Sequence, residues 1–590
     1  MTIAIYSVIP KFINYGTIRV ALQITGLPKK SLTKLYGSID SFTFSLPFSF
    51  FLLFSSLYIM KIGLDFGTTN SIISFITNDK PEAYSYPPLN GEKYIPSFIA
   101  YDLEGIEIGS SARKIAVYEP EIETYSQFKM RLPLPESEFH QYFKNNRTPI
   151  SVTIDYLKEL LISPDNDYSF TKEQGEISRL VVSVPEIWQR DIYNLGRERL
   201  QELIKKDLGL EKQLIQLVSE PIAAASYYAW EMQRRAQEEN TNPFQGNLLV
   251  CDMGGGTFDV SLCRIYSNNK IEVLYFDGEG DKGLESAGVA FDKNIVQIAY
   301  QKQFGEQIQE NDSKFIRLLR EFENVKIANH VKATRRLINY LEAPEDKAND
   351  EAYKFGEGYS VSLEEVQKAF TPIAQGIQKV MKRVIEQIKI QGYSIDRLFM
   401  VGGFSQFILV QEEIKNILGF ERNDVRIEQN FNITNSAYAI SYGACLIANG
   451  LVEPTEKYVH TLGIILETIA LTGERDKINI PLIKGGSSLD SLAETNFYEK
   501  EIEPIERRVT VTLWVQIQSK GFKHQNSLAD MIELPNYSPN TKYRVGMKVD
   551  RSHIAYLVIE SQGGESKIEY ELGEIISKMF PGYILKPDED

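Results

Sequence analysis

Two stretches, KIGLDFGTTNSIIS at residues 61–74 and LLVCDMGGGTFDVS at residues 248–261, decide the fold because they share one local pattern. Each is a short apolar strand followed by Asp, one apolar residue, Gly and two small residues, and then a β-rich run. The two aspartates, Asp65 and Asp252, lie far apart in the chain. The sequence therefore predicts one copy of the pattern in each of two lobes.

The turns that follow these strands suit a polyphosphate accompanied by a metal ion. Small residues let a turn approach closely and aim backbone N–H groups at phosphate oxygens, and Thr68, Thr69 and Thr257 add hydroxyl donors. The aspartates at the strand ends, Asp65 and Asp252, suit Mg²⁺ held through its waters, because Mg²⁺ dehydrates reluctantly. One copy alone would fit an ordinary strand and glycine turn equally well, but two copies in one chain favour a phosphate site.

Composition excludes several other classes of protein. The chain has 590 residues, 43% of them hydrophobic and 24% charged, which is typical of globular domains and too long for one core. Its net charge of −15 argues against nucleic acid as the main partner, because contacts to phosphates need a basic surface. Three cysteines without a CxxC motif indicate a reducing compartment, so we expect a cytoplasmic protein.

Other nucleotide and metal motifs are absent or weak. The sequence has no GxxxxGK[ST] P-loop, and its five histidines include no HExxH zinc motif. Gly278, Gly280 and Gly283 spell GxGxxG after the strand-like IEVLYF. No repeated βαβ pattern surrounds these glycines, so we do not expect a dinucleotide site there.

The first 59 residues differ from the rest in charge and hydropathy. They carry a net charge of +4, so the remaining residues carry −19. The uncharged stretch Ser41–Met60 resembles a signal anchor, yet Lys61 opens the predicted buried strand at once, without a polar linker or a small-residue cleavage site. We therefore interpret residues 1–59 as a non-native or targeting leader, with Met60 as the native start and no membrane partner in that case.

Further motifs occur in a fixed order along the chain. They are DFGTTNS (65–71), RLVVSVPEIW (179–188), LVSEPIAAASYY (217–228), CDMGGGTFDVS (251–261), RLFMVGGFSQFILVQEEIKNIL (397–418) and SAYAISYGACLIANG (436–450). Through them the chain resembles the 70-kilodalton heat-shock chaperone family of the actin, sugar-kinase and heat-shock ATPase superfamily. DFGTTNS and CDMGGGTFDVS resemble the two phosphate motifs of that family, and the others resemble its connecting and adenosine motifs. Such an ordered set rarely arises by chance, and GGGTFDVS and SEPIAAA are highly specific.

The resemblance implies ATP and Mg²⁺ as ligands and a role for individual residues. Asp65 and Asp252 resemble the aspartates that arrange Mg²⁺ and the attacking water, and Glu220 the carboxylate near both. Lys129 resembles the lysine on the transferred phosphate, where a fixed positive charge stabilises spreading negative charge. The implied catalytic residues are Lys129, Glu220, Asp252, Asp65 and Thr257. The implied nucleotide-binding residues are Gly67, Thr68, Thr69, Asn70, Gly254, Gly255, Gly256, Asp259, Glu323, Lys326, Gly402 and Gly403.

Simpler interpretations exist for some of these residues. Without the family context, Glu220 is an acid favoured at a helix start, and Lys129 is a solvated surface charge. Glu323 and Lys326 would likewise be an i,i+3 surface pair on a helix. Arg197 is a candidate for the arginine of the family's proline switch.

The base end of the site departs from the family pattern, while the phosphate end is intact. The family's glycine pair usually continues Ser-Thr-Arg, but Phe404, Ser405 and Gln406 follow here. Ile327 replaces the arginine that usually follows the lysine at position 326. Affinity or base selectivity is therefore expected to differ, with ATP as the nucleotide.

After Gly450 the composition changes to short alternating runs that predict β-strands. The clearest is RRVTVTLWVQIQ (507–518), and TLGIILE (461–467) resembles the first strand of the family's peptide-binding β-sandwich, although any small β-sandwich would fit. The connection LVEPTEKYVH (451–460) lacks the family's leucine linker. ESKIEYELGEIISKMF (565–580) predicts one short helix and no helical lid.

We therefore predict an α/β fold. Residues 60–450 form a two-lobed actin-like ATPase of two ribonuclease-H-like lobes, each on a five-stranded mixed sheet, and residues 451–590 form a small all-β domain. The predicted function is a divergent chaperone-like ATPase that slowly hydrolyses ATP with Mg²⁺ to regulate a protein or peptide client. The resemblance also implies J-domain and exchange-factor partners. The alternatives are an actin-like filament-forming ATPase, a small-molecule kinase of the same superfamily and a non-hydrolysing nucleotide sensor.

Overall fold

The computed structural model describes most of the chain from Ile59 onward. Its gaps are residues 88–90, 104, 120, 187, 189–194, 268–269, 280–286, 311, 422, 429–432, 470–474, 520–521, 565, 574–578 and 581–590. Nearer the N-terminus, β1 (Ile3–Ile5), β2 (Ile18–Ile24) and β3 (Phe42–Leu46) pair in an antiparallel sheet. Most of the apolar stretch interpreted as a leader lies outside the described residues, so that interpretation stays a prediction.

The first lobe is built on a six-stranded mixed sheet in the order β12-β11-β4-β5-β6, with β7 paired to β5. Its strands are β4 (Ile59–Phe66), β5 (Asn70–Thr77), β6 (Lys80–Ala83), β7 (Ile95–Pro96), β11 (Glu176–Val184) and β12 (Leu214–Ser219). The continuous apolar run of β4 is buried because β4 is central, parallel to β11 and antiparallel to β5. The prediction of five strands missed β7, which is too short to show a periodic pattern.

The second lobe is built on the predicted five-stranded sheet, in the order β18-β13-β14-β15-β19. Its strands are β13 (Gly246–Met253), β14 (Phe258–Ile265), β15 (Lys270–Glu279), β18 (Arg397–Val401) and β19 (Glu453–Thr455). As in the first lobe, the strand with the aspartate runs antiparallel to the next strand and parallel to another. The internal repeat read from the sequence is therefore a repeat of structure.

Two helices pack together at the junction of the lobes. α8 (Glu220–Glu239) and α15 (Ile433–Ala448) share one buried core with residues of both sheets. Their crossing is so close that a Cβ on Gly443 would lie 1.7 Å from the carbonyl oxygen of Ala223. Only glycine permits this approach, and it brings the segments predicted to connect the lobes together.

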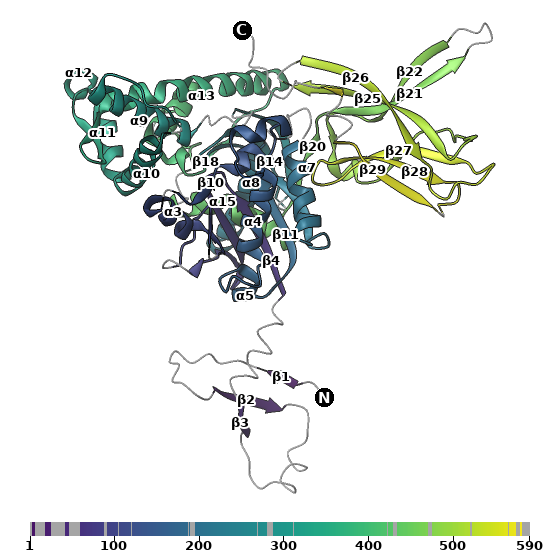
Figure 1. The fold of residues 1–590 in the computed structure, drawn as a ribbon, viewed down its shortest axis with the longest axis horizontal. Coiled ribbons are helices and arrows are strands. Elements are labelled where there is room, and N and C mark those ends of the chain that lie inside the picture. Colours follow the sequence, from purple (N-terminus) through teal and green to yellow (C-terminus); the bar gives the residue numbers. More distant parts are fainter. Residues whose placement is uncertain are drawn as a thin grey trace.

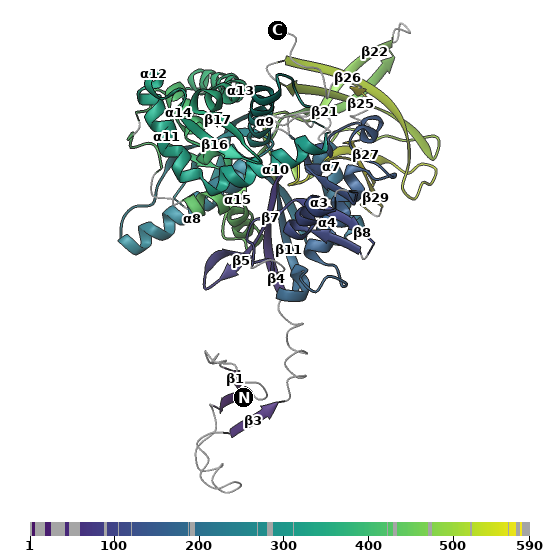
Figure 2. The same cartoon turned by 60° about the vertical axis from the view of Figure 1, so that its left-hand side comes forward.

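The outer helices divide between the two lobes (Figures 1 and 2). α3 (Gly109–Tyr118) and α4 (Pro149–Leu161) belong to the first lobe, and α9 (Gly288–Phe304), α10 (Ser313–Ala328), α11 (His330–Glu342), α13 (Leu363–Gln391) and α14 (Ile408–Leu418) to the second. Local sequence fixes where two of them begin. Thr148 and Ser151 form a capping box at α4, and Ser362 and Glu365 form one at α13.

The C-terminal part is all-β apart from short helical turns such as α16 (Leu489–Leu492), among the residues described there (Figure 1). One sheet has the order β22-β21-β25-β26 and the other β24-β27-β28-β29, and both contribute to one core. The strands are β21 (Thr461–Ile469), β22 (Arg475–Ile483), β24 (Asn496–Phe497), β25 (Arg508–Ser519), β26 (Phe522–Glu533), β27 (Tyr543–Val549), β28 (Ala555–Ser561) and β29 (Lys567–Glu571). The prediction of a helix over residues 565–580 was wrong at its start, because β29 pairs there with β28.

Candidate active site

The two predicted phosphate turns lie against each other across the lobes. The first turn, residues 67–69, joins β4 to β5, and the second, residues 254–257, joins β13 to β14. A Cβ on Gly255 would lie 2.5 Å from Cγ2 of Thr69, and one on Gly256 would lie 2.8 Å from Oγ1 of Thr68. These glycines therefore allow the backbone of the second turn to reach the threonines of the first.

Hydrogen bonds hold each turn to its own lobe. In the first, Ser97 donates its hydroxyl to the carbonyl of Gly67 (2.7 Å) and its backbone N–H to the carbonyl of Thr69 (2.9 Å). In the second, the carbonyl of Gly254 accepts the N–H of Gly288 at 3.2 Å. The side chain of Asn70, at the start of β5, donates to the hydroxyl of Thr69 at 3.3 Å.

A buried lysine–glutamate pair lies beside these turns. Lys129 comes from the 3₁₀ turn η3 (Phe128–Arg131), and its Nζ lies 2.5 Å from Oε1 of Glu220, the first residue of α8. The lysine is 1% exposed and the glutamate 7%. The interpretation of Lys129 as a solvated surface charge is therefore wrong.

Two aspartates complete the cluster at the ends of the central strands. Asp65 of β4 accepts a hydrogen bond from the hydroxyl of Ser183 at 2.9 Å, and Asp252 of β13 pairs in register with Asp259 of β14. Asp65 and Asp252, the two predicted Mg²⁺ ligands, are almost fully buried, and so are Thr257 and Asp259. The four predicted catalytic residues that carry a charge therefore lie close enough to influence one another's ionisation. They are Asp65, Lys129, Glu220 and Asp252.

Burial and mutual repulsion make the two aspartates harder to ionise. Burial, followed by the charge of Glu220, raises the pKa of Asp65 to about 7, against the lowering effect of Lys129 and Ser183. Burial also raises the pKa of Asp252 well above its usual value, with further contributions from Glu220, Asp259 and Asp65. The cluster therefore holds more negative charge than Lys129 balances, which suits an added cation.

The predicted nucleoside glycines follow β18 beside this cluster. Gly402 has φ +83°, and a Cβ there would lie 2.4 Å from Oδ1 of Asp252. Leaving out its chain neighbours, no atom of the described residues lies within 4 Å of a Cβ built on Gly403. Ser405, which departs from the family pattern, accepts the backbone N–H of Met253 at 3.1 Å and so ties this segment to β13.

The other nucleoside candidates make ion pairs outside the carboxylate cluster. Nζ of Lys326 lies 2.6 Å from Oδ2 of Asp292 and 5.6 Å from the ring centroid of Phe404. Burial raises the pKa of Asp292 to about 6, although Lys326 lowers it. Glu323 pairs instead with Arg113 of α3 in the first lobe, at 3.5 Å between Oε1 and Nη2. The structure does not bring Glu323 and Lys326 into contact with the catalytic residues.

Contacts between α3 and α10 bridge the lobes near these residues. Besides the Arg113–Glu323 pair, Nη1 of Arg320 donates to the carbonyl of Ala116 at 2.9 Å, and its guanidinium lies 5.2 Å from the ring centroid of Phe98. Sequence reasoning missed Arg113, Arg320 and Asp292. No motif marks them, because their partners come from distant parts of the chain.

Arg197 lies where the C-terminal β part meets the first lobe. It is fully buried on α7 (Leu195–Glu202), and its Nη2 donates to the hydroxyl of Ser219 at 2.8 Å. Its Nη1 donates to the carbonyl of Ser552, between β27 and β28, at 3.3 Å. Arg197 thus links the β part to the residue that precedes Glu220. The role of Arg197 in a proline switch stays a prediction.

The GxGxxG match has a structural explanation at its first glycine. Gly278 lies within β15 opposite Asp259, and a Cβ on Gly278 would lie 2.6 Å from Oδ1 of that aspartate. The position is a strand residue at a close approach rather than part of a phosphate turn. Gly280 and Gly283 lie outside the described residues.

Comparison with known proteins identifies the family of this chain. The family model described as "Hsp70 protein" matches residues 61–163 and 168–470. The chain belongs to the Hsp70 family. Its predicted fold class, a two-lobed actin-like ATPase fold followed by a β domain, is confirmed with it.

Several of the curated relatives that the chain matches are chaperone proteins DnaK. The chain is 25% identical to that of Thermosipho melanesiensis over 378 residues and 26% identical to that of Thermotoga maritima over 376 residues. It is 22% identical to that of Mycoplasmopsis pulmonis over 362 residues. Each match covers 61% of this chain and 55–56% of the relative, so the chain spans about half the length of the curated relatives it matches.

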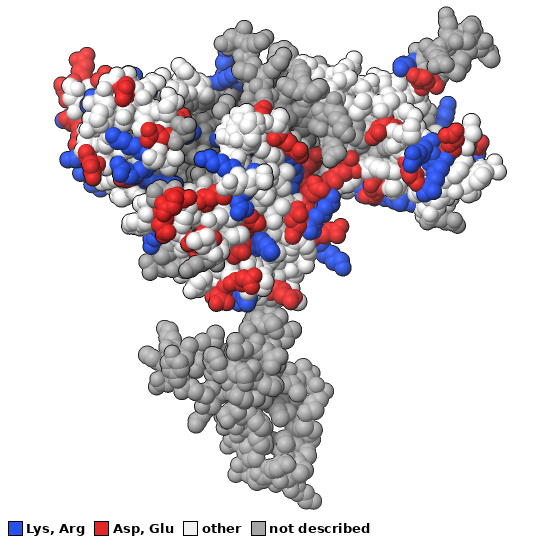
Figure 3. Space-filling model, viewed as in Figure 1, with Lys and Arg blue, Asp and Glu red and all other residues white. Residues whose placement is uncertain are grey.

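Surface charge and helix hydropathy add two observations on the described residues. Figure 3 shows acidic and basic side chains interspersed over the visible face. Among the helices of the described part of the chain, none is both long enough and apolar enough to cross a bilayer.

Proposed function

We propose that this Hsp70 family member binds ATP with Mg²⁺ between its lobes, hydrolyses it slowly, and uses nucleotide state to regulate the contact of its β domain with a protein or peptide. The observation that carries the proposal is the buried Lys129–Glu220 pair beside Asp65 and Asp252, at the place where the two phosphate turns meet. An acidic group with raised pKa values at such a junction is typical of a site that handles charged ligands.

The donor set fits Mg²⁺ held mainly through water. No cluster of three candidate ligands with metal-binding geometry occurs among the described residues, whereas Mg²⁺ commonly keeps several waters and uses one or two carboxylates. Asp65 and Asp252 would hold it, and their raised pKa values support the addition of positive charge at this cluster. When bound, the ion would neutralise charge on the phosphates.

The protein's own groups would supply position and charge. Backbone N–H groups of the turns at residues 67–69 and 254–257 would bind phosphate oxygens, with Thr68, Thr69 and Thr257 adding hydroxyl donors. The ammonium of Lys129 would stabilise charge that develops on the transferred phosphoryl group, while Glu220 would orient the attacking water. Gly402 and Gly403 would give the nucleoside close access to β18.

The link from Glu220 to the β domain supports regulation of a partner. Arg197 donates hydrogen bonds to both the hydroxyl of Ser219 and the carbonyl of Ser552. A movement of α8, which begins at Glu220, can therefore be transmitted to the β domain through these two hydrogen bonds. The partner would be a protein or peptide, as for chaperones of this family. J-domain and exchange-factor proteins are the corresponding candidates for regulators.

Turnover of ATP by the full chain tests the proposal. We expect Mg²⁺-dependent release of ADP that falls about 100-fold or more in Glu220→Gln and Asp252→Asn, a loss typical of removing one charge-stabilising group. Glu231→Gln is the matched control, because Glu231 is a buried acid on the same helix paired with Arg234. Equal turnover in all four proteins would overturn the catalytic assignment.

Two further assays address the regulated partner and the filament alternative. Binding of the full chain to a peptide array, with and without ATP, tests regulation, and the proposal expects a different set or strength of bound peptides in the two states. Sedimentation of the chain with ATP and not without it would instead select the filament-forming ATPase.

One observation favours the alternative of a nucleotide sensor without hydrolysis. The lysine predicted to contact the transferred phosphate has little freedom, because Lys129 is 1% exposed and its Nζ already lies 2.5 Å from Oε1 of Glu220. A lysine held in this way would bind a phosphate without following the charge that develops in the transition state. Binding of nucleotide in the absence of any ADP release would select the sensor.

A further inference from the structure

The turn between β27 and β28, residues 550–554, is seated in the first lobe. The hydroxyl of Ser552 accepts the backbone N–H of Leu217 at 3.0 Å, and its carbonyl accepts from Arg197 at 3.3 Å. Leu217 lies on β12, an edge strand of the first sheet. The bond to Ser552 therefore forms only while the turn is docked on the lobe.

A buried histidine is the next residue of this turn. His553 is 2% exposed and has φ +65°. Its Nε2 lies 2.9 Å from Oε2 of Glu456, which is 3% exposed and precedes β20 (Lys457–Tyr458). The histidine thus joins the docked turn to the segment that connects the lobes to the β domain.

Charged groups face His553 from each neighbouring element. They are Arg197 on α7, Glu456 before β20 and Asp550 in the same turn. The uncharged ring of Tyr458 also lies nearby, with its centroid 6.3 Å from that of His553. Burial, followed by the charge of Arg197, holds the pKa of His553 well below its usual value, although Asp550 opposes this. Glu456 already faces the buried guanidinium of Arg197, and so do Glu186, Asp550 and Glu220. A protonated His553 would be a second buried cation beside Arg197.

We propose that His553 is a proton-sensitive latch: the turn at residues 550–554 docks on the first lobe with a neutral imidazole and releases when that imidazole is protonated. The proposal concerns the seam between the lobe and the β domain, and it stands whether or not the chain hydrolyses ATP.

The direction of the pH effect follows from the two states of the histidine. In the released turn the imidazole titrates near its ordinary pKa of about 6.5, whereas docking lowers that pKa. Docking is therefore fully stable above about pH 6.5 and weakens as the pH falls below that value. One proton is involved, so the docking equilibrium constant falls about ten-fold for each pH unit in this range.

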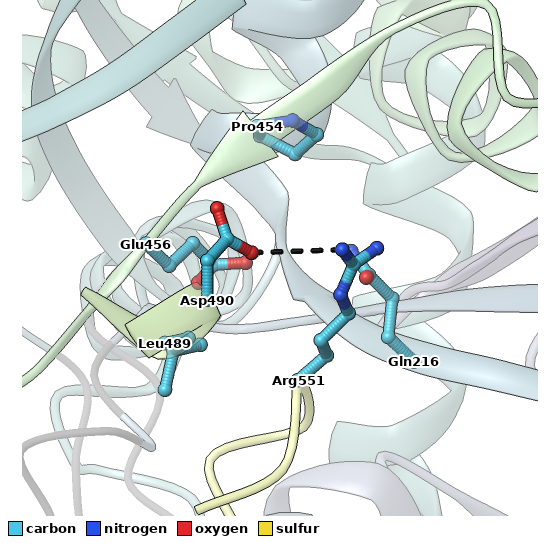
Figure 4. Close-up of a pocket in the computed structure, with 6 residues that line it drawn as sticks. All are labelled: Gln216, Pro454, Glu456, Leu489, Asp490 and Arg551. Atoms are coloured by element: carbon cyan, nitrogen blue, oxygen red, sulfur yellow. Dashed lines mark ion pairs between the residues drawn. The ribbon is translucent and has the colours of Figure 1, made fainter. Parts of the chain in front are cut away.

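Solvent reaches the seam at a small polar pocket (Figure 4). Glu456 lines it together with Gln216, Pro454, Leu489, Asp490 and Arg551. Arg551, the residue between Asp550 and Ser552, lies 3.5 Å from Asp490 between Nη2 and Oδ1. The carboxylate bonded to His553 thus belongs to a residue that lines this polar pocket.

Hydrogen exchange in the full chain between pH 5.0 and 8.0 tests the latch. The readout is the protection of peptides that contain Leu217, corrected for the intrinsic pH dependence of exchange. We expect the opening constant in the wild type to rise about ten-fold for each pH unit below about 6.5. In His553→Asn the opening constant should not depend on pH, because asparagine tolerates positive φ and does not titrate.

Two further variants keep the test decisive. His460→Asn removes another buried histidine near Tyr458 and should retain the pH dependence of the wild type. His553→Gly suits the positive φ and should lose that dependence, even if docking is weaker at every pH. A wild type whose opening does not change with pH, a persistent slope in both His553 variants, or loss of the slope in His460→Asn would each overturn the proposal.

Discussion

Replacing Lys129 with methionine tests whether the buried cation balances the carboxylate cluster. Its Nζ lies 2.5 Å from Glu220, and both side chains are almost fully buried. Removing one partner of such a pair leaves an uncompensated charge and costs about 3–5 kcal/mol. The pKa values of Asp65 and Asp252 should also rise further, because Lys129 lowers both.

A double-mutant cycle, measured by urea unfolding, shows whether the loss of stability in Lys129→Met comes from leaving Glu220 without its partner. We expect Lys129→Met to lose about 3–5 kcal/mol of unfolding free energy and Lys129→Met/Glu220→Gln to regain at least half of that loss. Lys206→Met is the matched control, because Lys206 lies 2.5 Å from Glu202 but on the surface, where a pair contributes about 1 kcal/mol or less. A Lys129→Met protein as stable as the wild type, or a double variant less stable than Lys129→Met, would refute the reasoning.

Three other outcomes follow from the site. The raised pKa of Asp65, about 7, means that this group binds more protons in the folded state than in the unfolded state, so it makes stability fall as the pH rises from about 4 to 7. Asp65→Asn should reduce this slope in denaturation curves and leave the part that comes from Asp252 and Asp292. Gly255→Ala should weaken ATP binding about ten-fold or more, because its Cβ would lie 2.5 Å from Cγ2 of Thr69, and Thr69→Ser should restore part of the affinity in calorimetry. Arg113→Ala should speed nucleotide release up to about five-fold at low salt, because its partly exposed pair with Glu323 contributes about 1 kcal/mol or less, and high salt should reduce the difference in stopped-flow traces.

The phosphate end of the site could be predicted from sequence because its determinants are local. A strand, an aspartate and a glycine turn dictate their own geometry, and two copies place Asp65 and Asp252 at equivalent strand ends. The pairing of Arg113 with Glu323 depends on how α3 and α10 meet, and nothing near either residue in sequence indicates it. Tertiary contacts of this kind cannot be predicted from a single sequence.

The sequence of the C-terminal part contains a strand pattern at a place where we predict a helix. KIEYE at residues 567–571 alternates, with Ile568 and Tyr570 packed against the core and their neighbours facing outward, which is the period of a strand. The sequence prediction places one short helix over residues 565–580 instead. Pairing with β28 decided the outcome, because an added strand satisfies backbone groups that a short isolated helix leaves open. Contacts such as Arg197 with Ser552 likewise join residues far apart in the chain.

A single-turnover experiment with the full chain tests the central claim most directly. Limiting ATP labelled on its γ-phosphate is mixed with excess protein and Mg²⁺, and free phosphate is followed in the wild type and in Asp252→Asn. The account predicts slow, complete release of phosphate by the wild type, dependent on Mg²⁺, and at least about 100-fold slower release by the variant. ATP that is bound by the wild type but released intact, or equal rates in the two proteins, would contradict it.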